Sequence, residues 1–224
     1  MDGKVIVIEG LDGSGKTTQW EMLKQSMKKA SFITFPNYKS DSGRIISRYL
    51  SGDFQSEDSA EHSAYSASSF YAIDRYISYK DSWKSIFTSG TNIITARYTT
   101  SNAIYQMPKL PENKWDEYHN WLCDYEYTKL GIPKPYLTIF LDVPIEISQE
   151  LLNKRYNSSG EKDIHEADVA YLQICRHAAL YAAEKEGWIT VDCVDSDSKT
   201  PALKTPETIN RELVKIIEKH LEGT

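Results

Sequence analysis

The chain has 224 residues, enough for one large domain, and its 40% hydrophobic content excludes a disordered or low-complexity protein. The 26 basic and 32 acidic residues give a net charge of −6, which argues against a broad nucleic-acid-binding surface. The N-terminal residues do not have signal-peptide architecture, and no apolar run approaches the ~18 residues of a membrane span. Three scattered cysteines (Cys123, Cys175 and Cys193) suggest buried thiols in a reducing compartment, so we expect a cytoplasmic protein.

Short apolar runs alternate with helical patterns along the whole chain. The runs predicted to be strands lie at 5–8, 32–35, 92–95, 137–141 and 188–191. The helical patterns lie at 16–30, 42–50, 58–80, 112–130, 145–156, 167–186 and 206–221. This alternation predicts one α/β domain over residues 1–224, with a mainly parallel, helix-covered sheet. The polar stretches 156–165 and 194–205 are predicted to be a lid and a surface loop.

The first strand is followed by a glycine-rich run, GLDGSGKT, that matches the pattern G-x-x-x-x-G-K-[ST]. Glycines let backbone N–H groups approach phosphate oxygens, and the helix that follows adds the positive end of its dipole. In this pattern Lys16 reaches the β- and γ-phosphates and Thr17 binds Mg²⁺. The predicted ATP-binding residues are Gly10, Leu11, Asp12, Gly13, Ser14, Gly15, Lys16, Thr17 and Thr18, with Mg²⁺ as the cofactor.

A P-loop does not by itself say what receives the γ-phosphate. A mechanical ATPase usually needs a longer chain than the 224 residues found here. A small-molecule kinase is therefore the default expectation.

Several segments, in chain order across nearly the whole sequence, resemble the thymidylate kinase family of nucleoside monophosphate kinases. They are IEGLDGSGKTTQ (8–19), FPNY (35–38), SGRII (42–46), SSFYAIDRY (68–76), ARYTTSNAIYQ (96–106), PKPYLTIFLDVP (133–144) and KDIHEAD (162–168). The resemblance implies a P-loop kinase fold with a five-stranded parallel sheet flanked by helices and a short lid around 154–166. It also implies transfer of the ATP γ-phosphate to dTMP, giving dTDP in dTTP biosynthesis, by a homodimer.

The same resemblance implies the residues that act on the phosphates. Asp12 helps to hold the metal or the acceptor side, although as bare sequence it could equally cap the helix that follows. Arg97 bridges the acceptor and transferring phosphates, beside Lys16. Because this P-loop contains no arginine, the lid is expected to supply the remaining positive charge, and Arg155 is the candidate that stabilises the transferred phosphoryl group.

The acceptor site implied by the resemblance draws on several segments. Its candidates are Arg44 and Tyr38 for the acceptor phosphate, Phe70 for stacking on thymine, Arg75 for a base carbonyl, Ser101 and Asn102 near the base, and Tyr105 against a ribose 2′-hydroxyl. Each has a structural alternative: Arg44 as a solvated helix arginine, Phe70 as a core residue with Tyr71 in its place, and the tyrosines as ordinary packing.

One departure from the family concerns the third strand. The family writes D-R-Y where this chain has Ala96-Arg97-Tyr98, and an Asp at that place commonly holds Mg²⁺. Asp142 is interpreted as structural, so it does not replace the missing carboxylate. Two alternatives to a dTMP kinase therefore stay open: a nucleotide-binding protein with impaired turnover, and a kinase for another pyrimidine monophosphate.

Overall fold

The computed structural model describes residues 1–54, 60–159, 169–195 and 202–222. Its central sheet has five strands: β1 (Val5–Gly10), β2 (Ser31–Thr34), β3 (Ile93–Ala96), β4 (Leu137–Asp142) and β5 (Ile189–Asp192). They lie in the order β2-β3-β1-β4-β5, and every neighbouring pair is parallel. The five-stranded parallel sheet predicted from the sequence is confirmed.

Strand β1 lies at the centre of the sheet because Val5–Ile8 are apolar on both faces, and all six of its residues are buried. In the parallel register Ile8 is opposite Ala96 of β3 and Gly10 is opposite Leu141 of β4. The carboxyl ends of these three strands therefore meet at one edge. In open α/β sheets this edge carries the ligand cleft.

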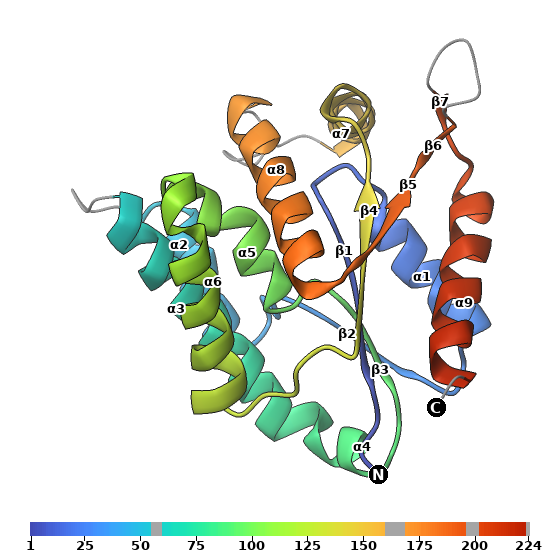
Figure 1. Cartoon of the computed structure of the whole chain (residues 1–224), viewed down its shortest axis with the longest axis horizontal. Coiled ribbons are helices and arrows are strands. Elements are labelled where there is room, and N and C mark those ends of the chain that lie inside the picture. Colours follow the sequence, from blue (N-terminus) through green and yellow to red (C-terminus); the bar gives the residue numbers. More distant parts are fainter. Residues whose placement is uncertain (55–59, 160–168, 196–201, 223–224) are drawn as a thin grey trace.

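The helices of the described chain cover both faces of the sheet. They are α1 (Lys16–Ser26), α2 (Asp41–Leu50), α3 (Ala60–Ser78), α4 (Lys84–Thr88), α5 (Thr100–Tyr105), α6 (Trp115–Cys123), α7 (Ile145–Ser159), α8 (Val169–Glu186) and α9 (Pro206–Glu222). The π-helical turns η1 (Tyr79–Trp83) and η4 (Asp124–Lys129) extend α3 and α6, and the 3₁₀ turns η2 (Met107–Lys109) and η3 (Glu112–Lys114) precede α6. In Figure 1, α1 and α9 lie on one side of the sheet, and α2, α3, α5, α6 and α8 lie on the other.

Each face of the sheet has its own apolar core. On one face, Leu23 of α1 and Leu213 of α9 are fully buried against Ile8 of β1. On the other face, the small residues Ala178 and Ala182 of α8 belong to the cluster around Phe140 of β4. Tyr118 and Trp115 of α6 are buried in the same cluster, so the aromatic-rich run that begins at residue 115 contributes to the core.

The structure differs from the predicted elements in three places. Residues 100–105 form the short helix α5, which is too short for its periodicity to stand out in the sequence. The helix predicted over 16–30 ends at Ser26, whose hydroxyl donates to the carbonyl of Met22. In the predicted loop 194–205, β6 (Val194–Asp195) pairs antiparallel with β7 (Ala202–Leu203).

Part of the predicted lid is described only as backbone. Helix α7 continues to Ser159, whereas the side chain of Arg155 and the rest of the lid lie outside the described residues. Asp142 at the end of β4 accepts two hydrogen bonds of 2.7 Å from Arg176 of α8, in agreement with its predicted structural role. The three cysteines all lie in the described part of the chain and form no disulfide, with Cys175 and Cys193 buried and Cys123 partly buried. Among the described helices, none combines the length and the apolar character that crossing a membrane requires.

Candidate active site

The glycine-rich run joins β1 to α1 at the carboxyl edge of the sheet. Gly13 and Gly15 have φ angles of 81° and 82°, in the left-handed region that side chains disfavour. A Cβ on Gly13 would also come within 2.4 Å of the Ser148 carbonyl oxygen of α7. Glycine is therefore required at position 13 by both backbone conformation and space.

Lys16 lies folded against this loop. Its Nζ donates to the carbonyls of Gly10 and Leu11 at 2.7 Å each and lies 3.8 Å from Oδ1 of Asp12. The loop, with Thr17 and Thr18, lines a cavity of about 860 Å³ at the start of α1, hereafter the larger cavity. That volume is within the usual range for small-molecule sites, and the backbone N–H groups at a helix start favour an anion there.

The metal expected with ATP fits this cavity in one respect. Thr17 offers a hydroxyl oxygen on its wall, the ligand that a P-loop gives to Mg²⁺. Asp12 is the carboxylate among the described lining residues, and Ala96, which also lines the cavity, has no side-chain oxygen. Mg²⁺ usually keeps several waters and binds through one or two carboxylates plus substrate phosphates. Thr17, with Asp12 as the carboxylate on the same wall and with water and nucleotide oxygens, therefore forms a reasonable donor set.

Arg97 sits directly after β3 in a strained backbone conformation. Its φ of 66° is in the left-handed region, although it is not a glycine. The turn is held by a hydrogen bond from the Arg97 N–H to the carbonyl of Ile8 and by the Thr95 hydroxyl, which donates to the Arg97 carbonyl at 2.8 Å. Such strained residues cluster at functional sites.

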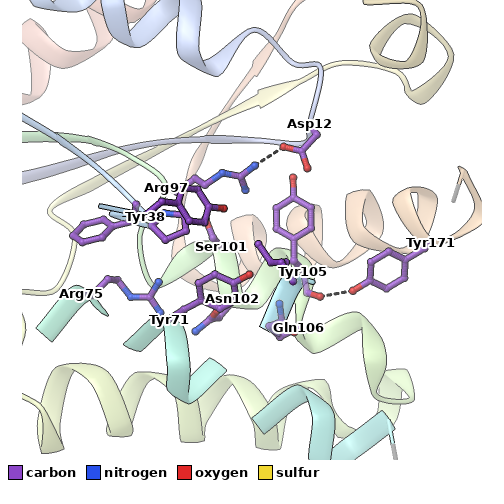
Figure 2. Close-up of a pocket in the computed structure, with 13 residues that line it drawn as sticks. Asp12, Tyr38, Tyr71, Arg75, Arg97, Ser101, Asn102, Tyr105, Gln106 and Tyr171 are labelled. Atoms are coloured by element: carbon purple, nitrogen blue, oxygen red, sulfur yellow. Dashed lines mark hydrogen bonds and ion pairs between the residues drawn. The ribbon is translucent and has the colours of Figure 1, made fainter. Parts of the chain in front are cut away.

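The guanidinium of Arg97 forms an ion pair with Asp12 and lies 5.1 Å from the centre of the Tyr105 ring. Figure 2 shows these three side chains converging, with the Tyr105 hydroxyl pointing toward Asp12. Arg97 and Asp12 line both the larger cavity and a second, narrower one. They therefore stand where the two cavities meet, between the triphosphate end and the rest of the site.

Charges in this cluster shift one another's ionisation. Burial raises the pKa of Asp12, but the charges of Arg97 and Lys16 outweigh it, so the pKa lies below the ordinary 3.8. Burial and the Asp12 charge raise the pKa of the Tyr105 hydroxyl well above 10. At neutral pH the cluster therefore holds an ionised Asp12 between two cations and a neutral phenol.

The narrower cavity, of about 110 Å³ and hereafter the acceptor pocket, lies beside Arg97 (Figure 2). Its polar and aromatic walls come from α3, α5, α8 and the loop after β2. These side chains are Tyr38, Tyr71, Arg75, Ser101, Asn102, Tyr105, Gln106 and Tyr171. Five of the predicted acceptor-site residues besides Arg97, namely Tyr38, Arg75, Ser101, Asn102 and Tyr105, therefore come together.

Two buried carboxylates hold the loops that carry these residues. Asp74 of α3 accepts from the N–H of Asn37 at 2.9 Å and from the Ser42 hydroxyl at 2.6 Å, which anchors the loop of Tyr38. Glu9 of β1 accepts from the hydroxyls of Thr100 and Ser101 at 2.7 Å each. Glu9 was not predicted as a site residue, although a glutamate in a fully buried strand is itself a signal.

Two predicted acceptor residues lie elsewhere. Phe70 does not line the pocket, because its ring packs 5.8 Å from Tyr49 and 5.6 Å from Phe54. Tyr71 lines it instead: it precedes Arg75 by four residues, one helical turn, so the two share a face of α3. Arg44 is exposed on α2, where it pairs with Asp41, and it lines neither cavity.

One cluster of metal-ligating residue types forms in the described chain. His119 and Cys123 of α6 meet Glu186 of α8. The Nε2 of His119 is hydrogen-bonded to Glu186 at 2.5 Å, so the ring nitrogen that faces the carboxylate is engaged. The Trp188 indole donates to the other carboxylate oxygen, and the cluster is explained as hydrogen bonding between two helices.

Comparison with known proteins agrees with this geometry. The family model described as Thymidylate kinase matches residues 8–200. The chain belongs to the thymidylate kinase family. Members of this family are ATP-dependent nucleoside monophosphate kinases.

Curated relatives match over most of their length. The thymidylate kinase of Mycobacterium tuberculosis is 30% identical over 192 residues, covering 82% of this chain and 87% of the relative. That of Plasmodium falciparum is 27% identical over 221 residues, covering 97% and 90%. A solved structure of thymidylate kinase from Candida albicans superposes with a TM-score of 0.74 at 23% identity, over 97% of this chain and 92% of the other. This last similarity supports the P-loop kinase fold.

Proposed function

We propose that this thymidylate kinase family member transfers the γ-phosphate of ATP to dTMP, giving dTDP, with the P-loop cavity holding ATP and the acceptor pocket holding dTMP. The observation that carries the assignment of the two sites is the pair Arg97 and Asp12, which lines both cavities. Because Arg97 and Asp12 lie where the two cavities meet, a phosphoryl group that moves from ATP to dTMP must pass these two side chains.

The proposed role of each residue follows from its charge and from its position in the two cavities. Lys16, released from the loop carbonyls, neutralises the donor phosphates, and Thr17 would hold Mg²⁺, which would supply further positive charge there. Arg97 aligns the acceptor phosphate for in-line attack, with Asp12 holding its guanidinium. No general base is needed, because the acceptor phosphate is already anionic. Positioning and electrostatic stabilisation therefore supply the catalysis.

The lid completes the proposal. Arg155, in the lid segment 154–166, contributes positive charge to the transferred phosphoryl group, and closure excludes the water that would otherwise hydrolyse ATP. The Arg155→Ala variant tests this role: kcat falls while the affinity for dTMP, measured without ATP, stays unchanged. An unchanged kcat would remove Arg155 from the mechanism.

The first experiment measures ADP production from Mg-ATP with and without dTMP, for the native chain and for Ala96→Asp. Rapid dTMP-dependent turnover of the native chain supports the kinase and makes a carboxylate at position 96 dispensable. Turnover only in Ala96→Asp identifies a kinase scaffold impaired at its metal site. Binding of dTMP with no turnover in either chain contradicts the proposal and favours a nucleotide-binding protein.

Acceptor selectivity is tested separately with dTMP, dUMP, dCMP and UMP. The donors of Arg75 suit a base carbonyl, and Tyr105 beside Arg97 is proposed to oppose a ribose 2′-hydroxyl. We expect dTMP to have the highest kcat/KM. Equal values for the four nucleotides would contradict the assignment to thymidylate.

We further propose that the protein acts as a homodimer in the cytoplasm. Helices α2 and α3 pack together, and each exposes isoleucine side chains: Ile45 on α2, and Ile73 and Ile77 one turn apart on α3. Light scattering of native protein and of Ile73→Glu/Ile77→Glu tests the dimer. A native monomer, or a variant that remains dimeric, would contradict this surface.

A further inference from the structure

A buried ion pair stands behind the acceptor pocket. Arg75 of α3 and Glu126 of η4 are 2% and 0% exposed. The Nε of Arg75 donates to Oε2 of Glu126 at 2.6 Å, and its Nη2 donates to Oε1, so the pairing is bidentate. The Nη1 of Arg75 donates to the Tyr98 carbonyl at 3.2 Å. The guanidinium is therefore fixed on its protein side by three contacts.

Glu126 also gathers two other residues near the pocket. The Thr99 hydroxyl donates to Oε2 at 2.8 Å, and Nδ2 of Asn102 lies 3.3 Å from Oε1. Asn102 and Arg75 both line the acceptor pocket, whereas Glu126 does not. One carboxylate that has no contact with the pocket thus connects α3, the loop after β3, and α5.

We propose that Glu126 is a positioning residue for the acceptor base: it fixes the amide nitrogen of Asn102 and orients Arg75 so that the remaining N–H groups of Arg75 face the 4-position of a pyrimidine, which selects a 4-keto base over a 4-amino base. This inference rests on the proposed function, because it assigns the pyrimidine of dTMP to the acceptor pocket.

The selectivity follows from the donor inventory of arginine. A guanidinium carries five N–H donors and no acceptor. Three of its donors are used by Glu126 and Tyr98, so the N–H groups left for the pocket can serve only an acceptor. The carbonyl of thymine or uracil accepts, whereas the amino group of cytosine would place donor against donor. A site built to hydrogen-bond one group rejects an analogue that leaves its buried polar groups unpaired.

The energetics favour a role in specificity over one in stability. A buried ion pair costs desolvation, and apolar replacements of similar volume are often as stable or more stable. Removing only the carboxylate leaves the Arg75 charge buried without a partner, free to turn toward other acceptors. Glu126 therefore controls where the donors of Arg75 point.

The experiment compares Glu126→Gln with native protein and with Glu186→Gln. Glu186 is a matched control: a largely buried glutamate that is hydrogen-bonded between two helices and lines neither cavity. For Glu126→Gln we expect the KM for dTMP to rise roughly 10-fold, with kcat and the KM for ATP within about threefold of native. The ratio of kcat/KM for dTMP over dCMP should fall roughly 10-fold, because Glu126 no longer fixes the direction of the Arg75 N–H groups. Glu186→Gln should keep the native ratio.

A second variant keeps the test valid if Glu126→Gln does not fold. Arg75→Met/Glu126→Leu replaces the pair with apolar groups and avoids a buried, unpaired charge. We expect it to fold, to bind dTMP weakly and to lose the preference for dTMP over dCMP. A preference preserved in either variant would overturn the proposal, as would equal rises in the KM of dTMP and ATP.

Failure of the proposed function gives a different result. Calorimetric titration of dTMP and dCMP without ATP measures the acceptor pocket alone. If native protein binds dTMP more tightly than dCMP but does not phosphorylate it, the kinase assignment fails while the role of Glu126 is still decided by the same titration on Glu126→Gln. If native protein binds the two equally, the role of Glu126 is overturned.

Discussion

The two ends of the site are built in opposite ways. The larger cavity is built around one contiguous run, residues 12–19, whose glycines and helix start present backbone N–H groups to a ligand, and its other walls come from β2, β3, α7 and the segment 203–209. The acceptor pocket draws its walls from α3, α5, α8 and the loop after β2, and one of its charged side chains, Arg75, is bound to a residue 51 positions away.

The difference lies in what recognises the ligand. A triphosphate is recognised by backbone groups and one lysine, which a short motif fully specifies. A base must be distinguished by side chains held in fixed directions, and holding them takes buried partners such as Glu126 and Asp74. Substitutions at the two ends should therefore affect different kinetic parameters.

The largest effect is expected for Lys16→Ala. Loss of this ammonium removes a cation from the transferring phosphates, so kcat should fall by about 10²–10³. Affinity for dTMP, measured by titration without ATP, should stay native. Lys24→Ala on the exposed face of α1 is the control, since Lys24 contacts Glu21 and Trp20 outside the larger cavity. A parallel loss of dTMP affinity in Lys16→Ala would show that the larger cavity and the acceptor pocket do not bind their ligands independently.

Tyr71→Ala and Phe70→Ala form the next comparison. Stacking of a base on an aromatic ring contributes ~1–3 kcal/mol, so loss of the Tyr71 ring should raise the KM for dTMP by roughly 5- to 150-fold. Phe70→Ala should lower stability through lost packing with Tyr49 and Phe54, and leave this KM near native. Steady-state kinetics with denaturant unfolding distinguish the two. The reverse pattern would show that Phe70 is the ring that stacks on the base.

A smaller effect concerns acid stability at the boundary of the two cavities. The folded-state pKa of Asp12 is below 3.8, so its carboxylate contributes stability above that pH and loses it as the pH falls through the folded pKa. Native protein should therefore be more stable than Asp12→Asn at pH 7, and the difference should narrow below pH ~4. Urea unfolding at pH 7, 5 and 3.5 measures it. If the difference in the free energy of unfolding between native protein and Asp12→Asn increased as the pH fell, the Asp12 carboxylate would not be stabilised by Arg97 and Lys16.

The smallest effect is expected at Cys123, three residues before Glu126. Burial raises the pKa of its thiol to about 11, so at pH 8 it is almost wholly protonated and unreactive. Cys123→Ser should leave the KM for dTMP within about twofold of native, because the Glu126 contacts do not involve it. Slow reaction of the folded protein with a disulfide reagent provides the second check. A large change in the KM for dTMP would show that Cys123 of α6 also helps to position the residues of the acceptor pocket.

Local patterns were sufficient for much of the molecule. The β-branched run at Val5–Ile8 and four similar short apolar runs predicted the five strands; the first run is continuously apolar because the central strand is buried on both faces. The P-loop was predictable because glycine spacing and Lys16 act within a few residues of one another. The short helix α5 and the β6–β7 pair were missed, since neither is long enough to show a period.

The acceptor pocket was predicted only in part. Of the residues that the resemblance implies, Tyr38, Arg75, Ser101, Asn102 and Tyr105 line the pocket, whereas Phe70 and Arg44 do not; Tyr71, the alternative to Phe70, does. The four-residue spacing from Tyr71 to Arg75 is a helical signal that places these two side chains on one face of α3. Glu126 had no local signal, because an acidic residue in an aromatic helix has the same pattern whether it faces solvent or a buried arginine.

The sequence by itself determined the strands, the glycine-rich loop and the family, because each depends on residues close together or on motifs in fixed order. Only the tertiary structure decided which ring of α3 faces the pocket, that Arg97 bends into a strained turn, and that Glu126 holds Arg75. Those facts depend on contacts between residues far apart in the chain. Such contacts form when helices pack on the sheet, and no local spacing encodes them.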